Sequence, residues 1–185
     1  MLLLAVLVPV VVVLLVLVNV RGDDGGGRDG GGQVADVSGT TSSPRGDLPP
    51  VAVDTPEVTP AADLACPVLM GQLPLELAGE SSRLVDSDTP FAYAWGDPAV
   101  VLVCGVDLPA GYVVGASTIL ISGVEWFVDT SDADLVVWTT VDRNVPVQVQ
   151  VPASTDSASV TALCPIIATA LPYTAPSPAP ASPTG

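Results

Sequence analysis

The sequence predicts an α+β domain with a small, mostly antiparallel sheet of about four to five strands. A short N-terminal helix and a C-terminal helix flank this sheet, and one transmembrane helix precedes it. Three observations predict this architecture. The chain begins with a long apolar run, two further apolar stretches that contain Cys-Pro favour helices, and between them lie valine-rich segments separated by turn residues, a pattern typical of strands.

The N-terminal run from Leu2 to Val20 contains no charged residue and is interrupted only by Pro9 and Asn19. Nineteen residues in a helix span about 28 Å, which is close to the thickness of the hydrocarbon core of a bilayer. A cleaved signal peptide would need a basic start and a small-x-small cleavage site, and the sequence has neither. We therefore expect residues 1–20 to be an uncleaved transmembrane anchor.

The residues after the anchor predict its orientation and the domain boundaries. Arg21 is followed by Asp23 and Asp24, so no cluster of positive charge holds the C-terminal side in the cytoplasm. We expect a single-pass protein of the cell membrane with an extracytoplasmic C-terminal domain. The composition predicts a disordered linker over 21–62, first Gly/Asp-rich and then Pro/Thr-rich, the folded domain over 63–172, and a disordered Pro/Ala-rich tail over 173–185.

Within the folded region, Cys66-Pro67 predicts the start of a short helix that ends before Pro74. A similar Cys-Pro to Leu-Pro pattern recurs from Cys164 to Pro172, which indicates either two similar helices on one sheet or a coincidence in a proline-rich chain. The predicted strands are Ala99–Cys104, Tyr112–Ile121, Val124–Asp129, Leu135–Val141 and Val145–Val151, the last two joined by Asp142-Arg143-Asn144, and the closing helix is Asp156–Leu171.

The charge balance excludes several classes of partner. The chain has 20 Asp and Glu but only 5 basic residues, all arginines, for a net charge of −15. Five scattered arginines cannot form the cationic patch that nucleic acid or anionic lipid headgroups require. We therefore expect no nucleic-acid partner and, apart from the membrane anchor, a partner that is an envelope protein or a wall component.

The residue types present also limit the chemistry. The chain has no histidine and no lysine, and it contains no phosphate-binding loop or nucleophile elbow. We predict no catalytic, cofactor-binding or metal-binding residues and no cofactor. The alternative hypothesis is a carboxylate-dependent cell-wall hydrolase or transferase that uses Asp97, Asp129 or Asp142, although aspartate is also a preferred turn residue.

Three cysteines on the oxidising side of a membrane suggest one disulfide and one remaining thiol. The sequence allows three pairings, and we favour Cys66–Cys104, which would join the first helix to the first strand. Cys164 is then a buried apolar residue, an alternative partner or a reactive thiol.

The primary functional hypothesis is a non-enzymatic binding module of the cell envelope. A contact patch for its partner would include Trp95, Asp97, Trp126, Trp138 and Arg143. Tryptophans are enriched at interfaces, but the same three residues could equally form the core. Arg143 at a hairpin tip is otherwise expected to be a solvated surface charge.

Four segments resemble an actinobacterial family of unknown function, DUF3515: ACPVLMGQLPLELAG (Ala65–Gly79), AWGDPAVVLVCGV (Ala94–Val106), SGVEWF (Ser122–Phe127) and VWTTVDRNVPVQVQVP (Val137–Pro152). The resemblance implies a small membrane-anchored or secreted envelope protein without an established activity. Two characteristic cysteines of that family correspond to Cys66 and Cys104, which supports the pairing, whereas Cys164 has no counterpart.

Overall fold

A computed structural model describes residues 44–180, which belong to one compact unit of the chain. The predicted anchor Leu2–Val20 and most of the predicted linker lie outside the described residues. Within 44–180, neither helix has the length and apolar character needed to cross a bilayer.

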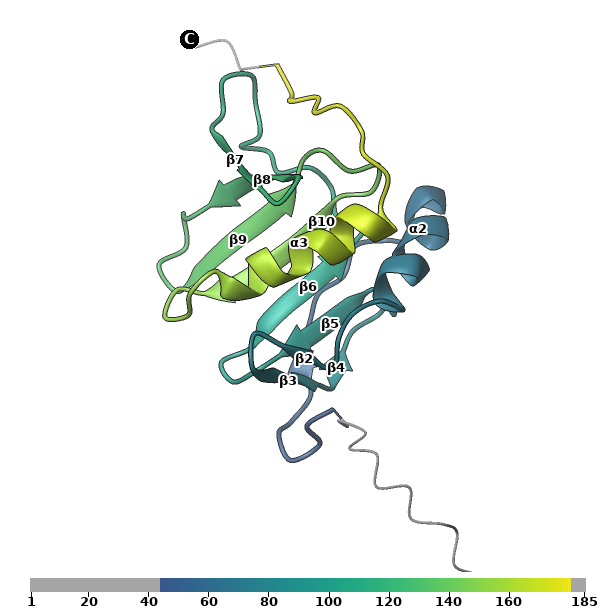
Figure 1. The fold of residues 1–185 in the computed structure, drawn as a ribbon, viewed down its shortest axis with the longest axis vertical. Helices are drawn as coiled ribbons and strands as arrows, with labels where there is room; N and C mark the ends of the chain where they lie inside the picture. The colour runs from purple at the N-terminus through teal and green to yellow at the C-terminus, as the bar shows by residue number, and fades with distance from the viewer. Residues whose placement is uncertain (1–43, 181–185) are drawn as a thin grey trace, which may run out of the picture. The chain divides into compact units, whose positions relative to one another are not determined.

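The domain is built on one antiparallel sheet with the order β2-β3-β5-β6-β10-β9-β8-β7 (Figure 1). The α+β class is confirmed, but this sheet has 8 strands instead of the expected four to five. The strands are β2 (Glu76–Leu77), β3 (Glu80–Arg83), β5 (Ala92–Trp95), β6 (Val100–Cys104), β7 (Thr118–Ile121), β8 (Val124–Asp129), β9 (Leu135–Thr140) and β10 (Val147–Pro152).

The position of β10 joins the two halves of the sheet. Strands β7 to β10 form a meander, and β10 then pairs with β6, with Val149 opposite Leu102 and Gln150 opposite Val101. Valines at alternate positions of β10 are buried and the glutamines between them are partly exposed, as expected for a strand with two different faces. By contrast, all five residues of β6 are buried, because both faces are covered at the centre of the sheet.

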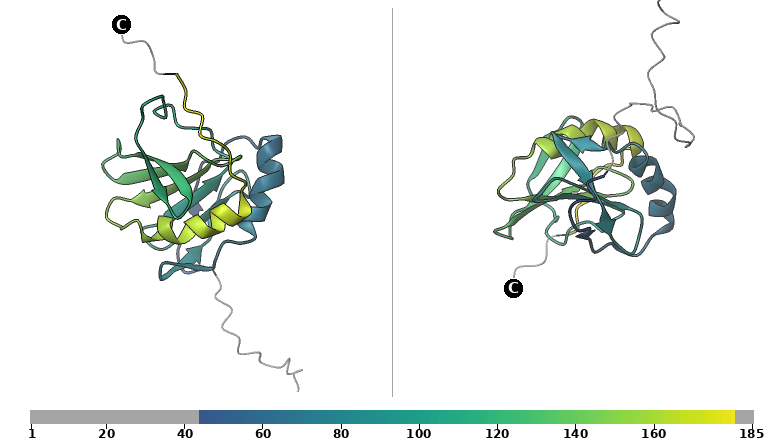
Figure 2. Two further views of the ribbon diagram at one scale, coloured as in Figure 1. Left: turned by 45° about the horizontal axis from the view of Figure 1, so that its top comes forward. Right: turned by 90° about the horizontal axis from the view of Figure 1, so that it is seen from below.

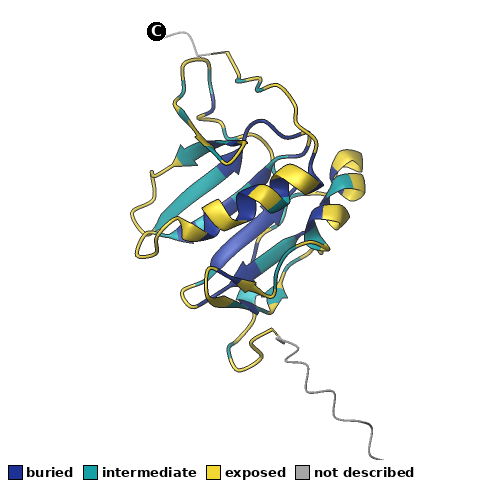
Figure 3. Cartoon of the chain, viewed as in Figure 1, coloured by how far each residue is buried: buried dark blue, intermediate teal, exposed yellow. Residues whose placement is uncertain are grey.

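Two helices, α2 (Pro60–Met70) and α3 (Ala158–Ala170), cover the same face of this sheet (Figure 2). Beneath them lies the main core, in which Leu69, Leu163 and Ile167 from the helices pack with Leu102 and the valines of β10. Figure 3 shows that each helix exposes its outer surface and buries its inner one. The two Cys-Pro segments are therefore two helices on one sheet, although Pro67 and Pro165 lie inside their helices.

The N-terminal boundary of the fold lies earlier than residue 63. Helix α2 begins at Pro60 and not at Cys66, because the Thr59 hydroxyl caps it by accepting a hydrogen bond from Ala62 N at 3.2 Å. Strand β1 (Val51–Ala52), within the predicted linker, pairs in parallel with β4 (Val85–Asp86). Val53 is buried there in a second apolar cluster, against the sheet face that the helices leave open.

The C-terminal segment is also part of the fold as far as residue 180. Thr174 N donates to Asp142 O at 2.9 Å, and Ala179 N donates to Tyr112 O at 3.1 Å. These backbone contacts hold a segment that the composition predicts to be a disordered tail. Its Pro-rich sequence gives no strand signal, because proline donates no hydrogen bond and only some of its residues pair with the domain.

One predicted strand is shorter than expected. Of Tyr112–Ile121 only Thr118–Ile121 forms a strand, and Tyr112 is instead buried within the loop between β6 and β7. Gly115 in this loop has φ +90°, a backbone conformation that interrupts a strand.

Candidate functional site

Arg45 and Arg83 are each paired with an aspartate. Arg45 pairs with Asp47 at 2.6 Å. Arg83 donates to Gly96 O at 3.2 Å and to Pro49 O at 2.8 Å, and lies 3.5 Å from Asp97 Oδ1.

Arg143 is buried, which contradicts its expected place at an exposed hairpin tip. Its Nη2 atom donates to Gly123 O, in the β7–β8 turn, and lies 3.3 Å from Asp142 Oδ2. The connection between β9 and β10 runs over residues 141–146 and folds under the C-terminal segment instead of projecting into solvent. Every arginine among residues 44–180 is thus paired with an aspartate, although the side chain of Arg45 is 42% exposed and lies on the surface.

The predicted tryptophan patch does not form an exposed surface. Trp95 and Trp126 are 0% exposed, and Trp138 is partly buried at 6.3 Å from Trp126 in an edge-to-face contact. Trp95 Nε1 donates to Pro74 O at 2.8 Å, which satisfies its polar atom inside the core. All three belong to the face under the helices, where large aromatic side chains bury the most apolar area. Of the five predicted patch residues, only Asp97 is exposed.

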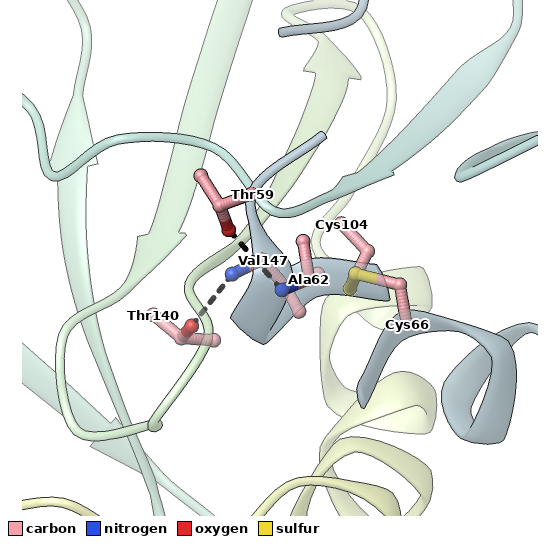
Figure 4. Close-up of a disulfide and its surroundings, with 6 residues drawn as sticks. All are labelled: Thr59, Ala62, Cys66, Cys104, Thr140 and Val147. Atoms are coloured by element: carbon pink, nitrogen blue, oxygen red, sulfur yellow. Dashed lines mark hydrogen bonds between the residues drawn. A yellow bond between two sulfur atoms is a disulfide. The ribbon is translucent and has the colours of Figure 1, made fainter. Parts of the chain in front are cut away.

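The predicted disulfide Cys66–Cys104 is present and joins α2 to the end of β6, with 5.8 Å between the Cα atoms (Figure 4). Closing a loop of this length stabilises the fold by about 4 kcal/mol in the chain-entropy model. Figure 4 also shows Thr140 Oγ1 accepting from Val147 N where β9 and β10 meet.

Cys164 is the remaining thiol and is buried in the core. Burial raises the pKa of its thiol, while the neighbouring Trp126 acts in the opposite direction. The thiol donates to Val160 O at 3.2 Å, one turn earlier in α3. These surroundings are those of a small core residue and not of a reactive thiolate.

The three carboxylates of the hydrolase hypothesis are not brought together. Asp142 lies beside Glu125, because Val141 N donates to Glu125 O at 2.9 Å. Glu125 and Asp129 are four residues apart on β8, or about 13 Å. Asp97 lies in the turn before β6, and strands β10 and β9 separate β6 from β8. Glycosidase carboxylates stand about 5 to 9.5 Å apart, so this set does not form such a pair.

Asp129 has instead the environment of a turn residue. Its Oδ1 accepts a hydrogen bond from Ser131 N at 2.9 Å, and hydrogen bonding from Ser131 lowers the pKa of its carboxyl. In the next turn position, Asp132 Oδ1 accepts from Asp134 N at 2.8 Å. No group of three acidic or cysteine side chains in the described part of the chain is placed to hold a metal ion.

Asp97 does line a hollow of about 360 Å³. Three separate segments form it: the β2–β3 turn, the β5–β6 turn and the residues that lead into α3. Glu80 lies against Gly96, and Asp156 accepts a hydrogen bond from Ala158 N at 2.9 Å at the start of α3. The acidic lining residues are Glu80, Asp97 and Asp156, and the hydroxyl-bearing ones are Ser154, Thr155 and Ser159.

Sequence reasoning singled out Asp97 but neither Glu80 nor Asp156. The three residues lie in unrelated segments, and no spacing in the sequence predicts that the β2–β3 turn and the start of α3 meet.

Two arginines lie near the carboxylates of this hollow. Arg83 is 3.5 Å from Asp97 Oδ1, and Arg45, whose pKa is raised mainly by its hydrogen bond with Asp47, also interacts with the charges of Asp97 and Glu80. Because Arg45 is paired with Asp47, the hollow keeps an excess of negative charge, which suits an ammonium or guanidinium group.

Comparison with known proteins identifies one family. The family model described as "Protein of unknown function (DUF3515)" matches residues 4–176. No curated protein and no solved structure matches the chain.

Proposed function

The chain belongs to the DUF3515 family of proteins of unknown function, and we propose that it is a non-enzymatic binding module of the actinobacterial cell envelope. In this proposal Leu2–Val20 anchors the protein in the cell membrane. The domain projects on the extracytoplasmic side, where it binds an envelope protein or wall component that carries positive charge.

The observation that carries this proposal is the state of the arginines. Arg83 and Arg143 are largely buried, and the exposed Arg45 is paired with Asp47, so the surface of residues 44–180 offers many carboxylates and no arginine without an aspartate partner. Surface charge of one sign steers and selects partners of the opposite sign. The acidic hollow beside Asp97 gives such a partner a concave place to bind.

Two further observations support the location and the absence of catalysis. A disulfide such as Cys66–Cys104 persists in oxidising compartments and is rare in the cytosol, and nineteen apolar residues suffice to cross a bilayer. The carboxylates proposed for hydrolysis lie too far apart to act as one acid–base pair. We therefore favour binding over hydrolysis or group transfer.

Photo-crosslinking in cells tests the proposal. A photoreactive amino acid replaces Pro98, which is exposed and lines the hollow, in the full-length chain. We expect a discrete crosslinked partner that is lost when Glu80→Gln and Asp156→Asn are combined, because both carboxylates that flank Asp97 are then neutral.

The matched control combines Asp86→Asn and Asp88→Asn, which remove the same charge from exposed positions outside the hollow. This control is expected to retain the crosslink. Loss of the crosslink in both double variants would show that net charge alone, and not the hollow, holds the partner. The absence of any adduct from Pro98 would contradict the proposal.

A further inference from the structure

We propose that the outer edge of β7 is the docking site for an extended basic segment of the protein partner, which adds to the sheet as a further strand. This inference deepens the proposed function and rests on it. It assigns the partner a chemistry, namely a strand that alternates apolar residues with Lys or Arg.

Strand β7 is an open edge of the sheet. Within residues 44–180, β7 pairs only with β8, and its other side has no backbone partner. Ile119 is 47% exposed and Leu120 is 71% exposed. An apolar edge strand without Lys, Pro or a bulge accepts another strand readily, and natural proteins usually protect such edges.

The opposite edge of the sheet shows that protection. Strand β2 has only two residues, Glu76 and Leu77, and Pro74 stands just before it. A short strand with an exposed carboxylate offers little to a pairing chain. The difference between the two edges singles out β7.

Acidic side chains lie beside β7 on one face of the sheet. Leu120 pairs with Glu125 and Thr118 pairs with Phe127, so these side chains share the sheet face that α2 and α3 leave open. Thr118 Oγ1 donates to Glu125 Oε1 at 2.6 Å, which fixes a carboxylate next to the edge. Asp129 follows on the same face, and the exposed Asp132 and Asp134 lie in the loop after β8.

An added strand would meet two different surfaces. On the helix face its side chains would lie beside Ile119 and Ile121, and the latter packs against the main core. On the other face they would lie beside Leu120 and within reach of Glu125. The aliphatic stem of Lys or Arg can cover Leu120 while its charge meets the carboxylates, which predicts the alternating pattern.

Charge complementarity also decides between a basic partner and a second copy of this chain. Pairing two β7 edges would bring Glu125 and the Asp129–Asp134 loop of both copies together. The arginines of residues 44–180 are each paired with an aspartate, and Arg143, which contacts the β7–β8 turn, is buried, so none is free to offset that repulsion. A basic segment would not bring these carboxylates together with others and would not introduce this repulsion.

The test measures binding of a short synthetic peptide of alternating lysine and valine to the full-length protein, together with amide hydrogen exchange. We expect saturable binding and slower exchange in residues 118–121. A peptide of the same sequence with N-methylated valines keeps the charge but cannot complete the strand pairing, and it is expected not to bind. Equal binding of both peptides, or unchanged exchange in β7, would overturn the proposal.

A matched pair of variants separates the edge from general electrostatics. Leu120→Lys places a repelling charge on β7 and is expected to weaken peptide binding by about tenfold. Leu64→Lys adds the same charge on α2 at a residue that is 79% exposed, and is expected to leave binding unchanged. Equal weakening by both variants, or self-association of the protein that Leu120→Lys abolishes, would overturn the proposal. If the crosslink from Pro98 survives in Leu120→Lys, the proposed function stands and only the edge assignment fails.

Discussion

Asp142 and Arg143 are neighbours in the sequence and form an ion pair inside the domain, with Arg143 Nη2 at 3.3 Å from Asp142 Oδ2. Their side chains are 3% and 4% exposed, respectively. The same guanidinium donates to Gly123 O in the β7–β8 turn, and Asp142 O accepts from Thr174 N in the C-terminal segment. The pair therefore links the β7–β8 turn, the β9–β10 connection and the C-terminal segment at Thr174.

Replacement of Arg143 by Met is expected to lower the free energy of unfolding by about 3 to 5 kcal/mol, because it leaves the Asp142 carboxylate buried without its cation. Urea denaturation of the full-length protein measures this change. Arg45→Met is the matched control, since Arg45 and Asp47 form an exposed pair, and we expect a loss of less than about 1 kcal/mol. Equal losses in the two variants would show that the buried pair has no special role.

Asp142 also gives the stability a defined pH dependence. Burial raises the pKa of its carboxyl above the ordinary 3.8, although a backbone hydrogen bond from Glu125 and the charge of Arg143 act in the opposite direction. The folded protein thus binds this proton more tightly than the unfolded chain does. The contribution of Asp142 is fully present below the ordinary carboxyl pKa and is lost as the pH rises through the raised value. We expect the difference in unfolding free energy between wild type and Asp142→Asn to fall over that window.

Asp129→Asn is the control, because the contribution of Asp129 to stability is expected to change with pH in the opposite direction. Hydrogen bonding from Ser131 lowers the pKa of Asp129, so its contribution is present above the ordinary carboxyl pKa and is lost as the pH falls through the lowered value. Urea titrations of the three proteins at several pH values measure both trends. Identical pH profiles for the two variants would contradict the assignment.

The sequence predicted the elements whose pattern is local. Strands β6, β8, β9 and β10 and helix α3 lie where valine-rich alternation or a long apolar segment indicated them. The disulfide Cys66–Cys104 was also predicted correctly. The strands and the helix depend on patterns of residues that are close in the sequence. The disulfide was one of only three possible cysteine pairings.

The features that the sequence missed depend on contacts between distant segments. Strand β3 has the polar sequence ESSR and is a strand because β2 and β5 pair with it on its two sides. The sequence around the tryptophans of β5 and β8 does not indicate which face of the sheet the helices cover. It therefore left open whether these side chains are exposed or buried. Arg143 looked exposed because its acceptor, Gly123 O, belongs to another hairpin.

Cys164 is expected to resist alkylation in the native protein. The thiol is fully buried, its pKa is raised by burial, and its proton is donated to Val160 O. Mass spectrometry after iodoacetamide treatment should show no adduct in the described domain under native conditions and one adduct in urea without reductant. Addition of reductant in urea should give three, since Cys66 and Cys104 are then released. Rapid native modification would indicate an accessible thiol.

Gly105 lies beside the disulfide, and its replacement by alanine is expected to destabilise the domain. Its φ is +90°, and a Cβ atom there would lie 2.9 Å from Ala62 Cβ and 3.6 Å from Cys66 Sγ. Gly123→Ala is the control, because Gly123 has φ +81° but open space around its Cα. We expect the control to cost about 1 to 2 kcal/mol for backbone strain alone. Gly105→Ala should cost about 1 to 3 kcal/mol more because of the clash with α2. Equal losses in thermal or urea unfolding would argue that α2 can move away.

The C-terminal segment is expected to stabilise the domain by covering the Asp142–Arg143 pair. A chain that ends at Pro172 lacks the hydrogen bond from Thr174 N to Asp142 O and both contacts between Ala179 and the loop at Tyr112–Val114. Three lost hydrogen bonds correspond to roughly 1.5 to 4.5 kcal/mol. The comparison is with a chain that ends at Pro180, so that only residues 173–180 differ. Hydrogen exchange of Tyr112–Val114 should accelerate in the shorter chain. If stability and exchange are the same in both chains, the segment rests on the domain without contributing to it.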